Sequence, residues 1–378
     1  MEGILIKIIK FISVLIAALS VFSFKTSALS DTSASSVLIN ADTLEIIYSN
    51  KPYVKRSMAS TTKIMTGILL AESGRLDEDI ECTSAMVTVE GSAMGLKAGD
   101  IISGRDLLYG LMLMSGNDAA NVAAYFLAGS TENFAIIMNE KAKMLGLNDT
   151  NFVTPSGLDA EEHYTTAFDL AKLTAYALMN DEFRKACSSY TAKVYFGNPK
   201  IRYTIKNHNR LLNEYEGCIG VKTGFTKKSG RCLVSAAERD GKRIIAVTLN
   251  DPNDWRDHKS MLDYGLVSLK PISFGDDPQK IKVIGGESDF VEIDFQDIDI
   301  FSIETNKSNF KFELDIPDYL VAPVIEGQKI GEAVLKYGDY VVRKCDVTPV
   351  CNVGRRSVQE KSGGEKIKDF LIKMLKSF

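Results

Sequence analysis

Three short strings of chemically able residues follow one another along this chain: Ser60-Thr-Thr-Lys63, Ser115-Gly-Asn117 and Lys222-Thr-Gly224. They supply a hydroxyl nucleophile, a lysine one helical turn away, a second hydroxyl with an amide, and a second ammonium beside a glycine. Such a set can open an amide through a covalent acyl-serine without using a histidine. Each string alone is weak evidence, and the prediction depends on their order.

In the first string, the spacing places Ser60 and Lys63 on the same face of a helix. Serine needs a base to take its proton, and lysine can be that base only if its pKa falls well below about 10.4. Burial and a nearby cation both lower the pKa of a lysine. The apolar helix that contains Lys63 must be buried, and Lys222 is the expected cation. The same spacing recurs at Ser308 and Lys311 in an alternating β segment, where we expect no chemistry.

The second string lies in the break between two apolar helices, which we expect at residues 105–114 and 118–128. Ser115 could relay a proton towards the leaving amine, and Asn117 could hold a substrate amide and bridge the two lysines. The alternative, which we favour for this string taken alone, is a helix boundary in which Gly116 ends one helix and a polar side chain caps the next.

The third string ends a segment that reads as a β-strand. Lys222 and Thr223 suit a terminal carboxylate, and Gly224 would let a substrate backbone approach the strand edge. We expect the backbone N–H groups of Ser60 and Phe225 to stabilise an oxyanion. The alternative is a solvated lysine before a β-turn.

Composition excludes several other classes of protein. The chain has 378 residues, 45% of them hydrophobic and 25% charged, with a formal net charge of −4. It contains three histidines, no metal-ligand spacing, no G-x-S-x-G string and no basic-aromatic patch, so we expect no metal, no cofactor and no nucleic-acid partner.

The six cysteines have irregular spacing, so we expect mostly free thiols, with Cys345 and Cys351 as the one local pair that could form a disulfide.

The N-terminus reads as an export signal covering residues 1–28. Lys7 and Lys10 precede an apolar run, residues 11–24, that is too short to span a bilayer comfortably, and cleavage is expected after Ala28. An uncleaved N-terminal anchor is the alternative. In both cases the body of the protein lies outside the cytoplasm.

Hydrophobic periodicity predicts two folded units. The expected elements are a strand hairpin at 35–50, helices at 60–72, 105–114, 118–128, 131–145 and 166–179, an alternating segment at 190–207, strands at 217–225, 231–238 and 242–250, and a helix at 255–269. Strands on both sides of a helical block predict an α+β fold with one antiparallel sheet whose first and last pieces meet. The short alternating runs in 278–350 predict a small all-β module, a sandwich.

The tail is expected to hold a linker at 357–364 and an amphipathic helix at 365–378. One helix face would carry Ile367, Phe370, Leu371, Met374, Leu375 and Phe378. From Arg355 onward there are seven basic and three acidic residues. A cationic amphipathic helix at a chain end is typical of membrane-surface binding; a helix docked on its own domain, or a mobile tail, is the alternative.

Four blocks of the sequence resemble the low-molecular-mass penicillin-binding proteins of the D-alanyl-D-alanine carboxypeptidase family. They are RSMASTTKIMTG (56–67), GLKAGDIISGRDLLYGLMLMSGNDAAN (95–121), NFVTPSGLDAEEHYTTAFDL (151–170) and GCIGVKTGFTKKSGRCLVS (217–235). The resemblance covers about residues 35–268 and, more loosely, the β module and the tail. It implies a penicillin-binding/β-lactamase-like transpeptidase domain and the division 1–28 signal, 29–272 catalytic domain, 273–354 β-rich domain, and 355–378 linker and membrane-surface helix.

The resemblance also implies roles for the three strings. Ser60 would be the acyl-ester nucleophile and Lys63 its proton acceptor, Ser115 and Asn117 would form the second motif, and Lys222 with Thr223 would bind the substrate carboxylate. The implied reaction removes the terminal D-alanine from peptidoglycan stem pentapeptides at the outer face of the cytoplasmic membrane, and penicillins would acylate the same serine.

Two histidines flank these motifs. His208 departs from the family pattern, because a small polar residue is expected there. We interpret it as a loop residue, with a contact to the cleft as the alternative. His163 is expected to be structural.

Three rival functions stay open. A class A β-lactamase needs a glutamate in an E-x-x-L-N string, and none occurs between Asn117 and Lys222. A D,D-endopeptidase or transpeptidase would use the same acyl-enzyme, although large transpeptidases carry a bulky domain before the nucleophile and only residues 29–59 precede Ser60 here. A non-catalytic receptor for cell-wall peptides or β-lactams is the third. The oligomeric state is left open.

Overall fold

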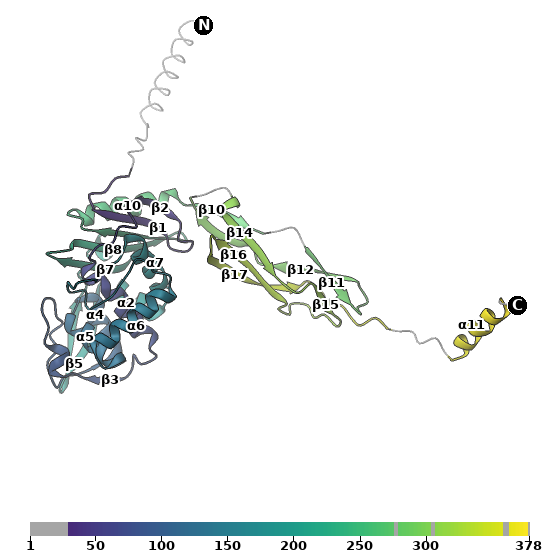
Figure 1. Ribbon diagram of the computed structural model, residues 1–378, viewed down its shortest axis with the longest axis horizontal. Helices are drawn as coiled ribbons and strands as arrows, with labels where there is room; N and C mark the ends of the chain where they lie inside the picture. Colours follow the sequence, from purple (N-terminus) through teal and green to yellow (C-terminus); the bar gives the residue numbers. More distant parts are fainter. Residues whose placement is uncertain (1–28, 276–278, 304–306, 358–362, 377–378) are drawn as a thin grey trace, which may run out of the picture.

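The computed structural model describes residues 29–275, 279–303, 307–357 and 363–376 (Figure 1). The predicted export signal at 1–28 and most of the predicted linker, residues 358–362, lie outside the described residues, as does Phe378.

A five-stranded antiparallel sheet with the order β2-β1-β9-β8-β7 forms the centre of the larger domain. Its strands are β1 (Ser35–Asn40), β2 (Ile46–Asn50), β7 (Cys218–Thr226), β8 (Gly230–Arg239) and β9 (Lys242–Leu249). The hairpin from the start of the domain therefore pairs with its last strand, since β1 runs beside β9 from Ser35, opposite Leu249, to Asn40, opposite Ile244. This confirms the prediction that the first and last pieces of one sheet meet.

Helices cover both faces of this sheet. They are η1 (Ala59–Thr62, a 3-10 turn), α2 (Lys63–Glu72), α3 (Ser84–Val87), α4 (Gly104–Leu113), α5 (Asn117–Ala128), α6 (Thr131–Met144), α7 (Ala167–Ala177), α8 (Asp181–Ser188), α9 (Leu211–Glu214) and α10 (Asp254–Ser268). Alternate residues of a strand point to opposite faces, so in β1 the Leu38 side chain joins Met261 and Leu262 of α10, whereas Val37 and Ile39 join the core that contains α2 and α7. Figure 1 shows α10 on one side of the sheet and α2, α4, α5 and α6 on the other.

A second, four-stranded sheet lies at the edge of the helical block. Its strands, in the order β3-β4-β5-β6, are β3 (Asp79–Glu81), β4 (Ile101–Ser103), β5 (Thr191–Gly197) and β6 (Lys200–Lys206). The alternating segment at 190–207 is thus a hairpin. Helix α8 was missed by the sequence analysis, because its eight residues are mostly polar and only Phe183, Ala186 and Cys187 are buried.

The C-terminal part is a β-rich domain, as predicted. Its strands are β10 (Lys270–Phe274), β11 (Gln279–Ile284), β12 (Phe290–Phe295), β13 (Ile298–Ser302), β14 (Phe310–Asp315), β15 (Tyr319–Val321), β16 (Gly331–Tyr337) and β17 (Tyr340–Pro349), with a 3-10 turn η2 at Lys307–Asn309. Six of them form the sheet β14-β16-β17-β12-β11-β15, and β10 pairs with β13. Strand β10 crosses residue 272, where the domain boundary was predicted.

Helix α11 (Gly363–Leu375) occupies the tail and begins two residues before the predicted start. Ile367, Leu371, Ile372 and Leu375 are exposed on it. Within the described ranges, no helix combines the length and apolarity needed to cross a bilayer.

Candidate active site

Ser60 lies in the single 3-10 turn η1, directly before α2, and not in the first turn of the α-helix as predicted. Ala59 has a positive φ of 48°, a backbone conformation that costs free energy for a residue with a Cβ. Two threonine hydroxyls hold the turn, since Thr61 Oγ1 donates to Met58 O at 2.6 Å and Thr62 Oγ1 to Ala59 O at 2.8 Å. The candidate nucleophile Ser60 is therefore carried on a braced turn at the head of a buried helix.

The Lys63 ammonium group meets three oxygen atoms from three parts of the chain. Its Nζ lies 3.1 Å from Ser60 Oγ and donates to Asn117 Oδ1 at 2.8 Å and to the carbonyl of Ser156 at 2.6 Å. The side chain has no exposed surface. The lysine is thus aimed at the serine hydroxyl and cannot swing into water.

The electrostatic surroundings disfavour the charged form of Lys63. Burial is the largest cause that lowers its pKa well below the usual value, and the nearby Lys222 lowers it further, against a smaller opposing effect of Asp118. Lys222 is itself buried, and burial lowers its pKa to about 7. Its Nζ donates to the carbonyl of Thr223 at 2.9 Å. A neutral Lys63 can accept the proton of the hydroxyl beside it, which is the property a general base needs.

The second string is a helix boundary, but not with the predicted caps. Helix α4 ends at Leu113 and α5 begins at Asn117, directly after Gly116, and no side-chain hydrogen bond among the described residues caps the start of α5. The Asn117 side chain instead reaches Lys63. The same amide donates from Nδ2 to the carbonyl of Glu90 at 2.6 Å, while its backbone N–H donates to Ser92 at 2.7 Å. Ser115, nearly buried and with a φ of 57°, presents its side chain at the cleft. The amide therefore links the lysine to the segment that forms one wall of the site.

Two contributors were missed by the sequence analysis. The carboxylate of Asp118 accepts the backbone N–H groups of Met94, Gly95 and Leu96 at 2.9, 2.9 and 3.1 Å, which fixes the wall segment. An acidic residue in the first turn of a helix is common because it interacts favourably with the helix dipole. The sequence does not indicate that the Asp118 carboxylate also contacts the distant segment 94–96. The carbonyl of Ser156 belongs to the backbone, so no residue type could have indicated it.

Strand β7 lies against the nucleophile turn. A Cβ placed on Gly224 would stand 3.0 Å from the backbone nitrogen of Ser60 and 3.1 Å from that of Thr61. The predicted reason for this glycine was the approach of a substrate, and the structure shows that it also admits the turn that carries Ser60. Phe225 follows as a side chain that is 65% exposed. The N–H groups proposed for the oxyanion therefore belong to adjacent segments.

A cleft of about 320 Å³ opens over these residues. It is lined by Ser60, Ser92, Ser115, His208, Thr223, Gly224, Phe225, Arg231, Cys232, Asp254 and Trp255. His208 lies in the loop between β6 and α9, and it nevertheless lines the cleft, so the structure supports the alternative given to it. Its pKa is lowered by burial and by Lys222. His163 instead contacts Thr62 Oγ1 at 2.8 Å and accepts from the N–H of Val153 at 2.9 Å, which braces the nucleophile turn.

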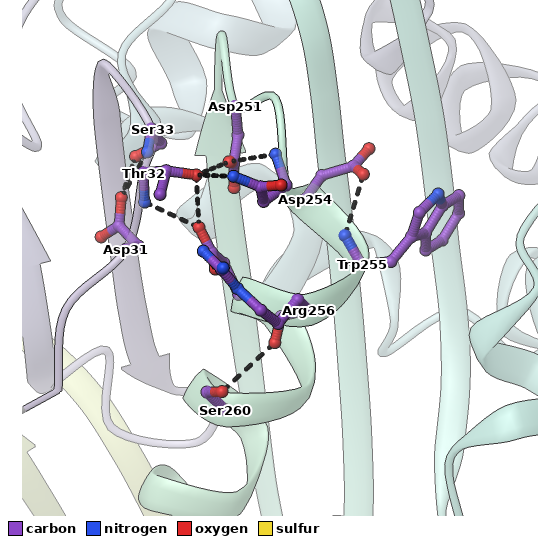
Figure 2. Close-up of polar contacts among 10 residues, drawn as sticks. Asp31, Thr32, Ser33, Asp251, Asp254, Trp255, Arg256 and Ser260 are labelled. Atoms are coloured by element: carbon purple, nitrogen blue, oxygen red, sulfur yellow. Dashed lines mark hydrogen bonds and ion pairs between the residues drawn. The ribbon is translucent and has the colours of Figure 1, made fainter.

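Trp255 lines the cleft and has two guanidinium groups near its ring. Arg210 stands 4.9 Å and Arg231 5.9 Å from its ring centroid. Arg231 is also paired with Asp254 at 2.9 Å, and the Asp254 carboxylate accepts the N–H of Trp255 at 2.8 Å. Figure 2 shows the indole pointing away from the polar network at the start of α10.

That network ties the first described residues to α10. Thr32 donates from Oγ1 to Asp251 at 2.7 Å and from its backbone N–H to Asp257 at 2.7 Å (Figure 2). The Asp257 carboxyl group has a lowered pKa; the hydrogen bonds from Thr32 and Arg256 outweigh the opposing effect of burial. The N-terminal segment therefore helps to fix the helix end from which Trp255 projects.

A second cavity, of about 590 Å³, continues the site on the side of Asn117. It is lined by Thr88, Val89, Glu90, Asn117, Asn121, Ser156, Leu158, Asp159, Thr226 and Lys227. Asp159 closes part of its rim, since its carboxylate accepts from Ser57 Oγ at 3.1 Å and from Thr226 Oγ1 at 3.0 Å. Both cavities border the candidate site, since Ser60 lines the first and Asn117, whose amide oxygen contacts Lys63, lines the second.

Comparison with known proteins places this chain in a well-populated group. Residues 23–253 match the family described as D-alanyl-D-alanine carboxypeptidase, and residues 268–354 match the family described as penicillin-binding protein 5, C-terminal domain. The chain is 31% identical to the D-alanyl-D-alanine carboxypeptidase DacF of Bacillus subtilis, over 85% of this chain and 86% of DacF. It is 37% identical to a D-alanyl-D-alanine carboxypeptidase of Streptomyces sp., over 60% of this chain and 84% of that protein. The structure of penicillin-binding protein 5 from Haemophilus influenzae aligns with a TM-score of 0.65 at 25% identity, over 86% of this chain and 98% of that one.

Proposed function

Since this chain belongs to the D-alanyl-D-alanine carboxypeptidase family, we propose that it is a serine-type hydrolase that removes the terminal D-alanine from peptidoglycan stem pentapeptides. One observation carries the proposal: the buried Lys63 amine lies 3.1 Å from Ser60 Oγ and is held by Asn117 and the Ser156 carbonyl. A base in this state beside a hydroxyl is the requirement for acyl-serine chemistry without histidine.

In the first half-reaction, Ser60 Oγ attacks the carbonyl carbon of the D-Ala–D-Ala amide and its proton passes to Lys63 Nζ. The carbonyl oxygen becomes an oxyanion, to which we assign the N–H groups of Ser60 and Phe225. The C–N bond then breaks, D-alanine leaves as the amine after taking a proton that Ser115 can relay, and the peptide stays as an ester on Ser60. Lys222 and Thr223 would hold the terminal carboxylate of the substrate.

In the second half-reaction, water attacks the ester, its proton passes to the lysine, and the shortened peptide leaves with Ser60 restored. Penicillins would acylate the same hydroxyl. Apart from the substrate and one water molecule, the reaction uses only residues of the chain, because the proton taken in each attack is returned when the product leaves.

The test is release of D-alanine from diacetyl-Lys-D-Ala-D-Ala by the purified protein, together with mass detection of a penicillin adduct on the peptide that contains Ser60. Release and a mapped adduct are expected. A protein that takes up penicillin at Ser60 but releases no D-alanine would be a receptor. Turnover of a chromogenic cephalosporin many times per second would instead indicate a β-lactamase, and cleavage of cross-linked dimers in preference to pentapeptides an endopeptidase.

We further propose that the protein acts outside the cytoplasm, at the outer face of the membrane, in cell-wall biogenesis. The support is the predicted export signal at 1–28 and the exposed apolar side chains of α11, which lie beside Lys368 and Lys373 of the helix and Lys376 directly after it. Removing residues 365–378 should release the protein from membranes and leave D-alanine release unchanged; unchanged sedimentation with membranes would contradict the anchor.

A further inference from the structure

The far end of the β-rich domain exposes an apolar sheet face. In the register of β11, β12 and β15, Lys282 lies opposite Phe290 on one side and Tyr319 on the other, and Ile284 lies opposite Val321. Paired residues, and residues two apart, point to the same face of a sheet. These five side chains, here called the tip face, therefore lie together, and the four apolar ones are between 45% and 65% exposed.

The tip face is not required for the core of its own domain. The alternate residues of the same strands, Ile281, Val283 and Val291, point inward and are buried. An antiparallel sheet with one wet face normally carries polar side chains there, and a contiguous exposed apolar patch on a protein marks a surface that binds something.

The chain leaves the β-rich domain next to the tip face. Arg355 forms a β-bridge with Gly286, and the N–H of Arg356 donates to the carbonyl of Gly285 at 2.9 Å, directly after β11. Six peptide steps then separate Ser357 from the start of α11, a reach of at most about 22 Å. If α11 lies on a membrane, Ser357, which directly follows the residues beside the end of β11, is held within that distance of the start of α11.

The chemistry of the tip face matches the interfacial zone of a bilayer. Tyr319 and Phe290 are aromatic side chains of the kind that gather at headgroup level, and Lys282 between them has an apolar stem and a charge that can meet a lipid phosphate. The nearby carboxylates of Asp289 and Glu292 are paired with Arg356 and Lys280. With seven basic and three acidic residues from Arg355 onward, anionic headgroups are the complementary partner.

We propose that the tip face is a second membrane contact, which inserts Phe290, Tyr319, Ile284 and Val321 at the headgroup level of an anionic bilayer and acts together with α11. This proposal rests on the proposed membrane location. Two contacts joined by a short linker bind more tightly than either alone, and two points of attachment also fix the tilt of the β-rich domain on the membrane. Asp318, exposed next to Tyr319, limits the contact to the polar zone.

The test uses the chain from Leu29 onward and vesicles of phosphatidylcholine with phosphatidylglycerol. The triple variant Phe290→Ser/Tyr319→Ser/Val321→Thr should sediment with vesicles about ten-fold more weakly than the unchanged chain. The matched control Ile136→Ser/Tyr195→Ser/Val267→Thr removes similarly exposed apolar groups from the larger domain and should bind as the unchanged chain does. All three proteins should release D-alanine at the same rate.

A second readout reports the position of the face directly. The chain contains a single tryptophan, Trp255, in the larger domain, so Phe290→Trp adds a reporter on the tip face. Brominated lipids should quench the fluorescence of this variant by a clearly larger fraction than that of the unchanged chain, and deletion of 365–378 should weaken binding without abolishing the quenching at high lipid concentration.

Four results would overturn the proposal. Vesicle binding of the triple variant equal to that of the control, with an unquenched tryptophan at 290, would show that α11 binds alone and leave the proposed anchor intact. A tryptophan at 290 that is shielded without lipid, and becomes exposed on deletion of 365–378, would show that α11 covers the face. A dimer in solution that the triple variant loses would assign the face to a second copy of the chain. Absence of vesicle binding by the unchanged chain would overturn both membrane proposals and would not touch the D-alanine release.

Discussion

Two segments of this chain share the spacing Ser-x-x-Lys and end in opposite environments. Lys63, next to Ser60, has no exposed surface, and its pKa lies well below the usual value. The side chain of Lys311, next to Ser308, is 72% exposed and paired with Glu313, which raises its pKa. The same four-residue pattern therefore holds a buried lysine with a lowered pKa in one place and an ordinary surface ion pair in the other, and the difference is made by the residues packed around it.

The contrast extends to the two domains that hold these segments. The larger domain buries two lysines without a carboxylate partner at hydrogen-bond distance in the described contacts, which opposes folding. The β-rich domain keeps its lysines at the surface in exposed pairs, such as those of Glu332 with Lys329 and Lys344, and exposed pairs of this kind contribute little to stability. Burial of these two lysines therefore lowers the stability of the larger domain, and the β-rich domain has no such cost from its exposed lysines.

The comparison can be tested most strongly at the two serines. Ser60→Ala should reduce D-alanine release by at least about 10³-fold and abolish the penicillin adduct, because the nucleophile is gone. Ser308→Ala should leave both unchanged. Intact-mass measurement after exposure to penicillin reads both variants, and an adduct on Ser60→Ala would assign the nucleophile elsewhere.

The two lysines provide the next largest contrast. Lys63→Met should slow acylation by about 10²–10⁴-fold, the usual contribution of a general base, while Lys311→Met should not change the rate. The rate of penicillin acylation measured by stopped-flow fluorescence is the appropriate readout, because it precedes hydrolysis of the ester. Equal rates for both variants would remove Lys63 from the proton transfer.

The pH dependence of acylation sharpens the role of the second lysine. The rate should rise with pH as Lys63 loses its proton. Lys222 disfavours the protonated form of Lys63. Lys222→Met should therefore raise the pKa of Lys63 and move the rising limb of the pH–rate profile to higher pH. Lys344→Met, which removes an exposed cation of the β-rich domain, is the control. A limb that stays in place in Lys222→Met would show that the two ammonium groups do not interact.

The last prediction concerns stability. A folded-state pKa of about 7, against an ordinary value of 10.5, means that Lys222 opposes folding at neutral pH, so Lys222→Met should raise the free energy of unfolding by up to about 4 kcal/mol at pH 7. The penalty is fully present below pH 7 and fades as pH rises to 10.5, where the unfolded lysine also loses its proton. Urea denaturation at pH 7 and pH 10 should therefore show a gain for the variant that shrinks at the higher pH.

Much of the fold could be predicted because it depends on local patterns. The alternating runs of β7, β8 and β9 and the apolar helices α2, α4 and α5 were found close to their observed bounds. Elements with weak periodicity were not predicted. Helix α8 is short and polar, and the 3-10 turn η1 differs from the first turn of an α-helix only in its backbone hydrogen bonds and dihedral angles. These choices are made by packing on neighbouring segments and not by intrinsic preference.

The sequence alone determined which chemical groups are available and in what order, because residue types and short-range spacing are covalent properties of the chain. Tertiary structure alone decided that Lys63 and not Lys311 is buried, that the Ser156 carbonyl and Asp118 complete its surroundings, and that His208 and Trp255 line the same cleft as Ser60. The physical reason is that a pKa depends on the dielectric surroundings and on charges brought near by folding. The spacing of a motif along the chain contains neither.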